Sequence, residues 1–225
     1  MKKILLILIL AILVLGFGCA PRSFLENPAK ESKEKTTEVT ETVKEETKTT
    51  EDQSYMKLID KAKSYQSLSY DIGEDALTRR LYTVYLKGDN MKLALPDYVH
   101  IGNREYYDTV YLNKAANEAL AYCESREKYF CPDNNKQYKV KYNEYIHKSP
   151  FVWLSEVQNP TYVGVEVINF RETTKLSYLK NNKDAFIWID NFYGLPIKVL
   201  EPSGKSWFFN YININNLKDT EVIHS

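Results

Sequence analysis

The sequence predicts a mainly antiparallel β fold with few helices, an α+β domain of about ten strands. Short runs in which apolar and polar residues alternate recur from Leu81 onward, and a period of two is typical of half-buried strands. Turn residues separate these runs at regular spacing, as in an antiparallel meander. The 225-residue chain also has 18 tyrosines against 8 glycines, and tyrosine suits a pleated, half-buried surface.

The expected strands are joined by recognisable turns. Lys87–Asn90, Asn181-Asn182 and Pro202–Gly204 each stand between two alternating runs, and Gly, Asn and Pro favour the backbone conformations of turns. We therefore expect strands at Leu81–Leu86, Met91–Leu95, Tyr106–Leu112, Glu118–Cys123, Gln137–Tyr142, Tyr162–Phe170, Lys175–Leu179, Ala185–Asp190, Leu195–Leu200 and Ser206–Ile214.

Two helices are expected beside the strands. Residues 53–66 place apolar side chains at helical spacing on one face, which indicates a helix that covers the sheet. Ser149 and Pro150 favour the start of a second helix, because serine caps helices and proline is preferred at the first helical position. Asn159-Pro160 ends this second helix. The apolar face of the first helix consists of Tyr55, Leu58, Ile59, Ala62 and Tyr65.

The N-terminus predicts an export signal. The basic start Met1–Lys3 precedes an apolar run, Ile4–Phe17, and small residues follow before Cys19, which is the order of a secretory signal. The run of about 14 residues is shorter than the roughly 20 that cross a bilayer as a helix. We therefore expect residues 1–18 to be a signal peptide and the rest of the chain to lie outside the cytoplasm.

Cys19 is the predicted site of lipid attachment. Gly16–Cys19 resembles a lipobox, in which the cysteine is lipidated and becomes the first residue of the mature chain, although Leu15 stands one place earlier than usual. Two or three acyl chains, at about 0.8 kcal/mol per buried methylene, hold a protein firmly on a membrane. The lipid would place the domain on the extracytoplasmic face of the cell membrane. An uncleaved membrane helix from Ile4 to about Ala20 is the alternative anchor.

Residues 19–52 are expected to form a lipidated N-terminus and a disordered linker. From Lys30 to Asp52 the chain is nearly all Lys, Glu and Thr, with only Val39 and Val43 as large apolar residues. So little apolar surface cannot offset the loss of chain entropy on folding. The linker is either a spacer through an outer layer or a generic tether, and the folded domain is expected over residues 53–225.

Cys123 and Cys131 are predicted to form a disulfide. Two cysteines this close in an exported chain usually pair, and here they would close the loop Glu124–Phe130. A metal site would need further ligands, and the nearest histidine, His147, is distant in sequence. Redox catalysis usually uses Cys-x-x-Cys, so a structural disulfide is the favoured interpretation.

Composition and motifs argue against several function classes. The 30 basic and 30 acidic residues balance, so the chain lacks the positive field that gathers nucleic acid. The histidines His100, His147 and His224 form no metal-binding pair, and neither a Gly-x-Ser-x-Gly motif nor a phosphate-binding Gly-rich loop occurs. We expect no enzyme activity, metal or cofactor, although paired carboxylates stay open because pairing is spatial. Asp190 is expected to form a turn.

One block of sequence resembles a known family. Phe186-Ile187-Trp188-Ile189-Asp190, a turn through Gly194, and Leu195–Val199 resemble the late hairpin of the LolA/LolB-like lipoprotein-carrier superfamily, and Trp207–Ile214 resembles its next strand. The order of elements extends the resemblance over Tyr55–Leu217. The resemblance implies an unclosed β half-barrel whose apolar concave face lies under a lid of helices and binds acyl chains.

Two functions are compatible with these observations. The first is an anchored half-barrel that binds a lipid, the acyl chain of a lipoprotein or another apolar ligand without catalysis. The alternative is a surface interaction or sensing module whose core is filled by its own side chains and which binds an envelope protein. The superfamily includes stress-sensing regulators, so the fold does not decide between them. The sequence identifies no ligand-binding residues.

Overall fold

A computed structural model of the chain describes residues 54–75, 80–127 and 129–224. The expected signal peptide, the lipidated Cys19 and the linker up to residue 52 lie outside the described residues. Within the described ranges, none of the helices has the length and apolar character needed to cross a membrane.

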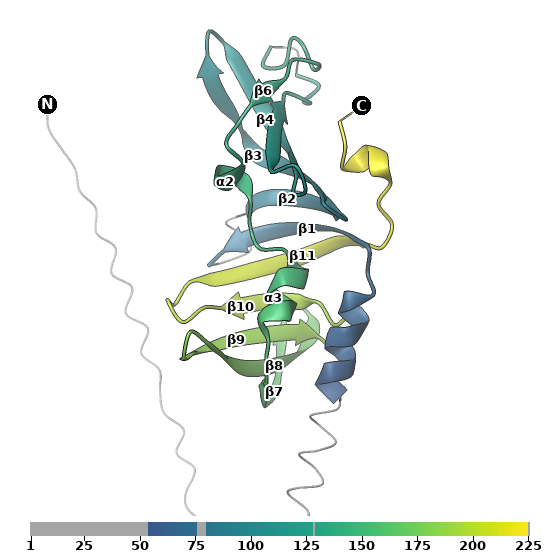
Figure 1. Cartoon of the computed structure of the whole chain (residues 1–225), viewed down its shortest axis with the longest axis vertical. Coiled ribbons are helices and arrows are strands. Elements are labelled where there is room, and N and C mark those ends of the chain that lie inside the picture. The colour runs from purple at the N-terminus through teal and green to yellow at the C-terminus, as the bar shows by residue number, and fades with distance from the viewer. Residues whose placement is uncertain (1–53, 76–79, 128, 225) are drawn as a thin grey trace, which may run out of the picture. The chain divides into compact units, whose positions relative to one another are not determined.

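The strands in the described part of the chain form one antiparallel sheet of eleven strands (Figure 1). Its order is β6-β5-β4-β3-β2-β1-β11-β10-β9-β8-β7, and the two edge strands do not pair with each other. The sheet is therefore not closed, which confirms the predicted fold class of an unclosed, mainly antiparallel half-barrel with few helices. The strands are β1 Ser67–Glu74, β2 Arg80–Lys87, β3 Asn90–Gly102, β4 Glu105–Asn113, β5 Glu118–Tyr122, β6 Tyr138–Lys139, β7 Thr161–Ile168, β8 Arg171–Lys180, β9 Lys183–Asp190, β10 Pro196–Leu200 and β11 Ser206–Ile214.

Strand β1 joins the two halves of the sheet, and the sequence analysis did not predict it. It pairs with β2 on one side and with β11 on the other, with Tyr70 opposite Tyr211 and Ile72 opposite Phe209. Its first four residues are all buried, including Ser67 and Ser69. Both faces of the strand are covered, so its apolar and polar residues do not mark a buried and an exposed face. The alternation that predicted the other strands is therefore not a guide here.

The helices lie where the sequence placed them, with one addition. The first helix spans residues 54–63, and α3 spans Pro150–Glu156, with the Ser149 hydroxyl accepting a hydrogen bond from the Val152 N–H. The strand predicted at Gln137–Tyr142 is wrong beyond β6, because the chain leaves the sheet edge and forms the short helix α2, Tyr142–Tyr145. A 3-10 turn, η1, covers Asp219–Glu221.

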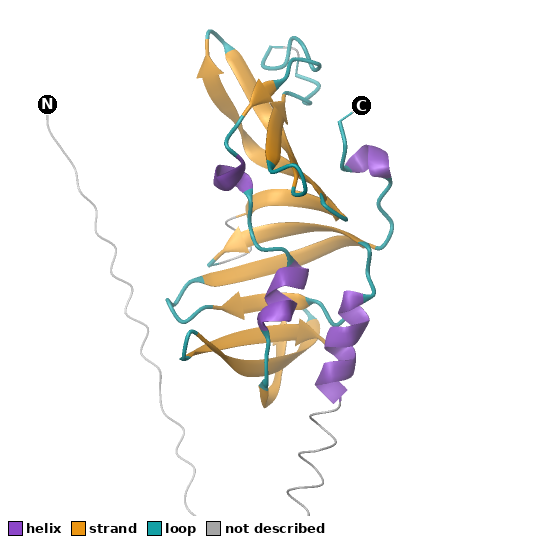
Figure 2. Ribbon diagram, viewed as in Figure 1, coloured by secondary structure: helices purple, strands orange, loops and turns teal. Residues whose placement is uncertain are grey.

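Two helices cover one face of the sheet. The helix of residues 54–63 and α3 lie side by side in front of β8–β11 (Figure 2), and both contribute to one buried apolar core. Tyr55, Ile59 and Ala62 are buried on the first helix, as its spacing predicted. This half of the concave face is thus filled by the side chains of the protein itself. The core partners there include Trp153, Leu154, Leu176, Tyr178, Ile187, Ile189, Ile197, Val199 and Phe209.

The turn between β9 and β10 holds the first helix against the sheet. Asp190 is buried, and its Oδ1 accepts hydrogen bonds from the N–H groups of Phe192 and Tyr193 at 2.8 and 2.7 Å, so its predicted role in the turn is confirmed. Gly194 follows with φ of +74°, and a Cβ atom there would lie 1.9 Å from the backbone oxygen of Leu58. Only glycine allows the helix to approach the turn this closely.

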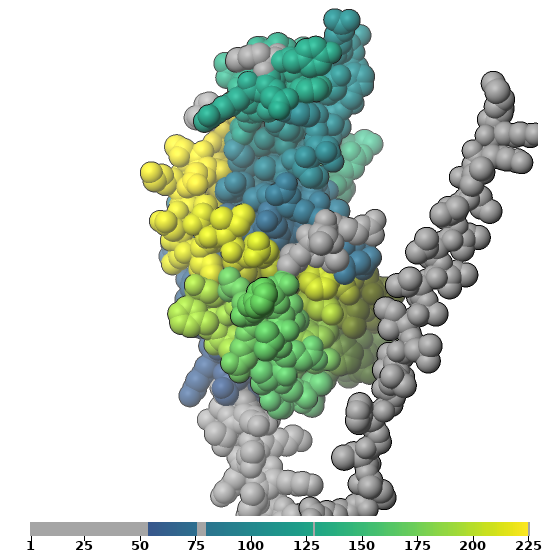
Figure 3. Space-filling view, turned by 180° about the vertical axis from the view of Figure 1, so that it is seen from behind, coloured from purple at the N-terminus to yellow at the C-terminus, as the bar shows by residue number. Residues whose placement is uncertain are grey.

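The C-terminal segment packs on the opposite face of the sheet. Seen from behind, the yellow C-terminal residues lie against the blue N-terminal strands (Figure 3). The His224 ring stacks on Tyr122 with centroids 3.7 Å apart, and Val222 is buried. The Lys87 ammonium donates a hydrogen bond to the Leu217 carbonyl at 2.9 Å. The C-terminal segment is thus held against β5 through His224 and against the end of β2 through Lys87.

Candidate functional site

A pocket of about 920 Å³ lies beyond the filled half of the core, over β2, β3 and β4. Its floor consists of Leu86, Met91 and Leu112, three buried side chains from these neighbouring strands. Leu86 and Met91 are directly opposite in the register, as are Met91 and Leu112. Because residues opposite each other on paired strands point to the same face, the three side chains form one continuous apolar surface.

Aromatic and aliphatic side chains from the helices form the walls of the pocket. Tyr65 follows the first helix, Tyr142 is the first residue of α2, and the half-buried Phe151 is the second residue of α3. Ile146 and Val152 lie at the rim and are 37% and 36% exposed. The rim therefore presents apolar side chains to solvent beside a buried apolar floor, which is an arrangement suited to an apolar ligand.

Lysines supply most of the charge around the pocket. Lys63, Lys87, Lys114 and Lys148 all line it, and Asp89 is the single acidic residue in the lining. Most of these charged groups are exposed or half-buried, so they border the pocket without filling its apolar floor.

His147 is the one histidine in the lining, and its surroundings favour a structural role. Its Nε2 and the Tyr70 hydroxyl are hydrogen-bonded at 3.3 Å, its Nδ1 lies 3.4 Å from the Tyr145 carbonyl, and its ring stacks on Tyr82. Burial lowers the pKa of His147 to about 4. The imidazole is therefore neutral near pH 7 and adds no charge to the pocket.

Tyrosine hydroxyls tie the segment that carries His147 to the sheet. The hydroxyls of Tyr107, on β4, and Tyr145, on α2, are hydrogen-bonded to each other. Burial raises the pKa of Tyr145 and that of the fully buried Tyr70, so both hydroxyls stay protonated and keep these hydrogen bonds over the physiological range. The C-terminal end of α2 and the residues after it are thus fixed to β4 and β1 by polar contacts.

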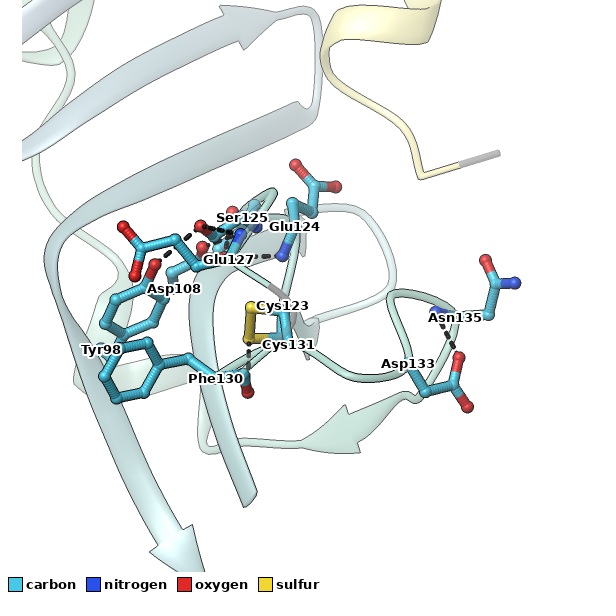
Figure 4. Close-up of a disulfide and its surroundings, with 11 residues drawn as sticks. Tyr98, Asp108, Cys123, Glu124, Ser125, Glu127, Phe130, Cys131, Asp133 and Asn135 are labelled. Atoms are coloured by element: carbon cyan, nitrogen blue, oxygen red, sulfur yellow. Dashed lines mark hydrogen bonds between the residues drawn. A yellow bond between two sulfur atoms is a disulfide. The ribbon is translucent and has the colours of Figure 1, made fainter. Parts of the chain in front are cut away.

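The predicted cysteine pair lies at the far end of β5, away from the pocket lining. A disulfide joins Cys123 and Cys131, with their Cα atoms 5.2 Å apart (Figure 4). Asp108 accepts hydrogen bonds from the N–H groups of Glu124 and Ser125 at 2.8 and 2.9 Å. Asp108 and the two sulfur atoms are close enough to bind a metal, but the carboxylate is occupied by backbone N–H groups and both sulfurs by the disulfide.

The sequence analysis missed the residues that line the pocket. They come from segments between Lys63 and Val152 that are far apart in the chain, and only the sheet register and α2 bring them together. One signal was present, because Leu86, Met91 and Leu112 belong to predicted strands and alternate with polar neighbours. That pattern identifies a buried face but does not show whether side chains or a ligand cover it.

Comparisons with known proteins identify no family. No family model matches the sequence, and no curated protein matches it. Solved structures of similar arrangement include lipoprotein LppX of Mycobacterium tuberculosis (12% identity, TM-score 0.42, 73% of this chain and 95% of that chain). LprF of Mycobacterium bovis is similar at 12% identity and a TM-score of 0.40, over 74% and 93% of the two chains.

A third similar structure is the MucA/MucB complex of Pseudomonas aeruginosa, at 11% identity and a TM-score of 0.40, over 76% of this chain and 60% of that chain. Likenesses at this level carry no argument about function. The interpretation of this protein therefore depends on its own sheet and pocket.

Proposed function

We propose that this chain is an extracytoplasmic lipoprotein, anchored through Cys19, that binds an acyl chain or another apolar ligand in its half-barrel without catalysis. The observation that carries the proposal is the pocket of about 920 Å³ on an apolar floor. Ligand pockets commonly measure roughly 300–1,000 Å³ and are mostly apolar. An acyl chain that covers the floor gains about 25 cal/mol for each Å² of apolar surface removed from water.

We also propose that the chain is a distant member of the LolA/LolB-like superfamily. The residues that carry the resemblance, Phe186–Val199, form the β9–β10 hairpin, and Trp207–Ile214 falls within β11. The sheet is unclosed and has helices on one face, as the resemblance implies. Support for the anchor comes from the lipobox-like Gly16–Cys19 alone.

A neutral apolar probe tests ligand binding without regard to a head group. The purified full-length chain is titrated with N-phenyl-1-naphthylamine, whose fluorescence rises in apolar surroundings. Val152→Trp places a bulky ring at the rim, at a side chain that is already 36% exposed, so it blocks entry while leaving the core intact. We expect probe affinity to fall by about tenfold or more, equivalent to roughly 1.4 kcal/mol.

The control is Val167→Trp, which adds the same ring on β7 at a side chain that is 71% exposed and outside the pocket. Unchanged probe affinity is expected there. Failure of the parent protein to bind the probe, or equal losses in both variants, contradicts a binding site in this pocket.

Partner binding is the second candidate function, and strand β7 favours it. Within the described part of the chain, β7 pairs with β8 alone and forms one edge of the sheet. Val163, Val165 and Val167 on this strand are exposed, and Phe170 in the following turn is fully exposed. An exposed edge with apolar side chains can accept a strand from another protein. Val165→Lys should abolish such an association while leaving probe binding unchanged.

A further inference from the structure

We propose that the ligand of this pocket is an anionic phospholipid, whose head group is held by Lys63 and Lys114 at the rim. This inference rests on the proposed function, because it specifies the head group of a ligand whose tail occupies the apolar floor. It would give the pocket a preference among lipids with identical acyl chains.

The two lysines come from different elements that converge on the same pocket. Lys63 ends the first helix, and Lys114 follows β4. The Lys114 N–H donates to the Asp89 carbonyl at 2.9 Å, so the turn after β4 lies against the turn after β2. The apolar floor begins directly inside these turns, since Leu86, Met91 and Leu112 lie one to two residues from the turn ends. A molecule on this floor has its polar end among lysines.

The balance of charge in the lining favours an anion. The lining has four lysines and one acidic residue, Asp89. The carboxylate that pairs with Lys63 lies outside the lining: Asp60 lies 3.0 Å from Lys63 with its side chain 66% exposed. Exposed pairs of this kind contribute little stability, about 0–1 kcal/mol. A phosphate can therefore take over the Lys63 ammonium group while the carboxylate remains in water. Lys87 has no such role, because the Leu217 carbonyl and the Asp219 carboxylate hold its ammonium group on the opposite face of the sheet.

Lys114 is less committed to other partners than Lys63. Among the described residues, its ammonium group makes no ion pair with a carboxylate. An exposed lysine beside an apolar pocket can follow a head group with its flexible side chain. Lys148, also in the lining, differs because it is bound to Glu156 and lies 4.5 Å from the centre of the Trp153 ring. We therefore do not assign a head-group role to Lys148.

The test compares two lipids that differ only in the head group. The full-length chain in detergent is mixed with equal amounts of dioleoyl phosphatidylglycerol, which is anionic, and dioleoyl phosphatidylcholine, which is zwitterionic. Native mass spectrometry then measures the ratio of the two bound forms. We expect the anionic lipid to be favoured by about 25-fold, since each of the two lysines beside a head group of net negative charge contributes about fivefold. The preference should fall at high salt because ions screen the rim.

Lys63→Gln with Lys114→Gln should reduce the preference to about one- to twofold, since the two substitutions remove both fivefold contributions. The matched control is Lys57→Gln with Lys183→Gln, which removes the same charge at two exposed lysines outside the lining and should leave the ratio unchanged.

Each outcome of the experiment bears on the proposal. Equal binding of both lipids by the parent protein overturns the head-group assignment and leaves the proposed function standing. Equal loss of preference in the test and control variants also overturns it, because net charge would then be the cause. Failure to bind either lipid overturns the phospholipid assignment, and the proposed function itself is overturned only when the neutral probe also fails to bind.

Discussion

Replacing Gly194 by alanine should be among the most destabilising single methyl additions in this domain. A Cβ atom at Gly194 would lie 1.9 Å from the oxygen and 2.7 Å from the carbon of the Leu58 carbonyl group. Both contacts are with backbone, so relief requires the helix of residues 54–63 to move away from the β9–β10 turn. Tyr55, Ile59 and Ala62 on that helix are buried, and their packing would be lost in part.

The expected cost has two parts. A left-handed backbone conformation costs a non-glycine residue roughly 1–2 kcal/mol, and the φ of +74° places Gly194 in that region. Forcing an extra methyl group into a closely packed site costs about 1–3 kcal/mol more. Together the free energy of unfolding should fall by about 2–5 kcal/mol, which lowers the Tm of a domain of this size by roughly 5–15 °C.

Gly204→Ala separates the two parts. Gly204 also has a positive φ, +89°, but a Cβ atom there meets no heavy atom within 4 Å. Its replacement should therefore cost only the backbone part, roughly 1–2 kcal/mol. Urea unfolding of the parent and both variants, followed by circular dichroism, measures the difference. Equal losses in the two variants would refute the close contact between the first helix and the turn.

Further predictions concern titration, the Asp190 turn and the disulfide. Burial lowers the pKa of His147 in the folded protein to about 4. Above pH 6.5 the imidazole is neutral in both the folded and the unfolded chain, but between pH 6.5 and 4 only the unfolded chain binds the proton. The free energy of unfolding should thus fall through this window by up to about 3 kcal/mol, and urea unfolding of His147→Gln should lack that part of the slope. Asp190→Ala should lower the free energy of unfolding by roughly 3–5 kcal/mol, because it removes the acceptor of the turn N–H groups and of the Arg171 guanidinium, which lies 3.0 Å from the Asp190 carboxylate. Asp190→Asn should cost less, because the amide oxygen can still accept. A cost equal to that of alanine would contradict the acceptor role in the turn. Cys123→Ser with Cys131→Ser should cost about 2–3 kcal/mol because the disulfide closes a short loop of separation 8, and an unchanged urea midpoint would contradict a stabilising role.

Local patterns in the sequence were sufficient for most of the sheet. The alternation in Ser206–Ile214 and the turn residues Asn181-Asn182 each reflect a single strand or hairpin, so a short window contains the whole signal. The capping of α3 by Ser149 and the turn at Asp190 are also local, because each depends on hydrogen bonds within a few residues. These features were predictable for that reason.

Features that depend on distant contacts were not predicted. β1 follows the first helix closely and has buried serines, and its place between β2 and β11 depends on residues more than 100 positions away. α2 begins at Tyr142, the last residue of a strand predicted at Gln137–Tyr142, and its Tyr145 is held by Tyr107 of β4. The pocket depends on contacts of this kind, because its wall includes α2 and its floor combines side chains of β2, β3 and β4.

The most direct test of the central claim is to locate a bound acyl chain. A fatty acid with a photoreactive diazirine near its methyl end is bound to the full-length chain, irradiated and mapped by peptide mass spectrometry. The account predicts adducts on the pocket lining, at Leu86, Met91, Leu112 or Phe151, and their loss in Val152→Trp. Adducts confined to the opposite face of the sheet, or unaffected by Val152→Trp, would contradict it.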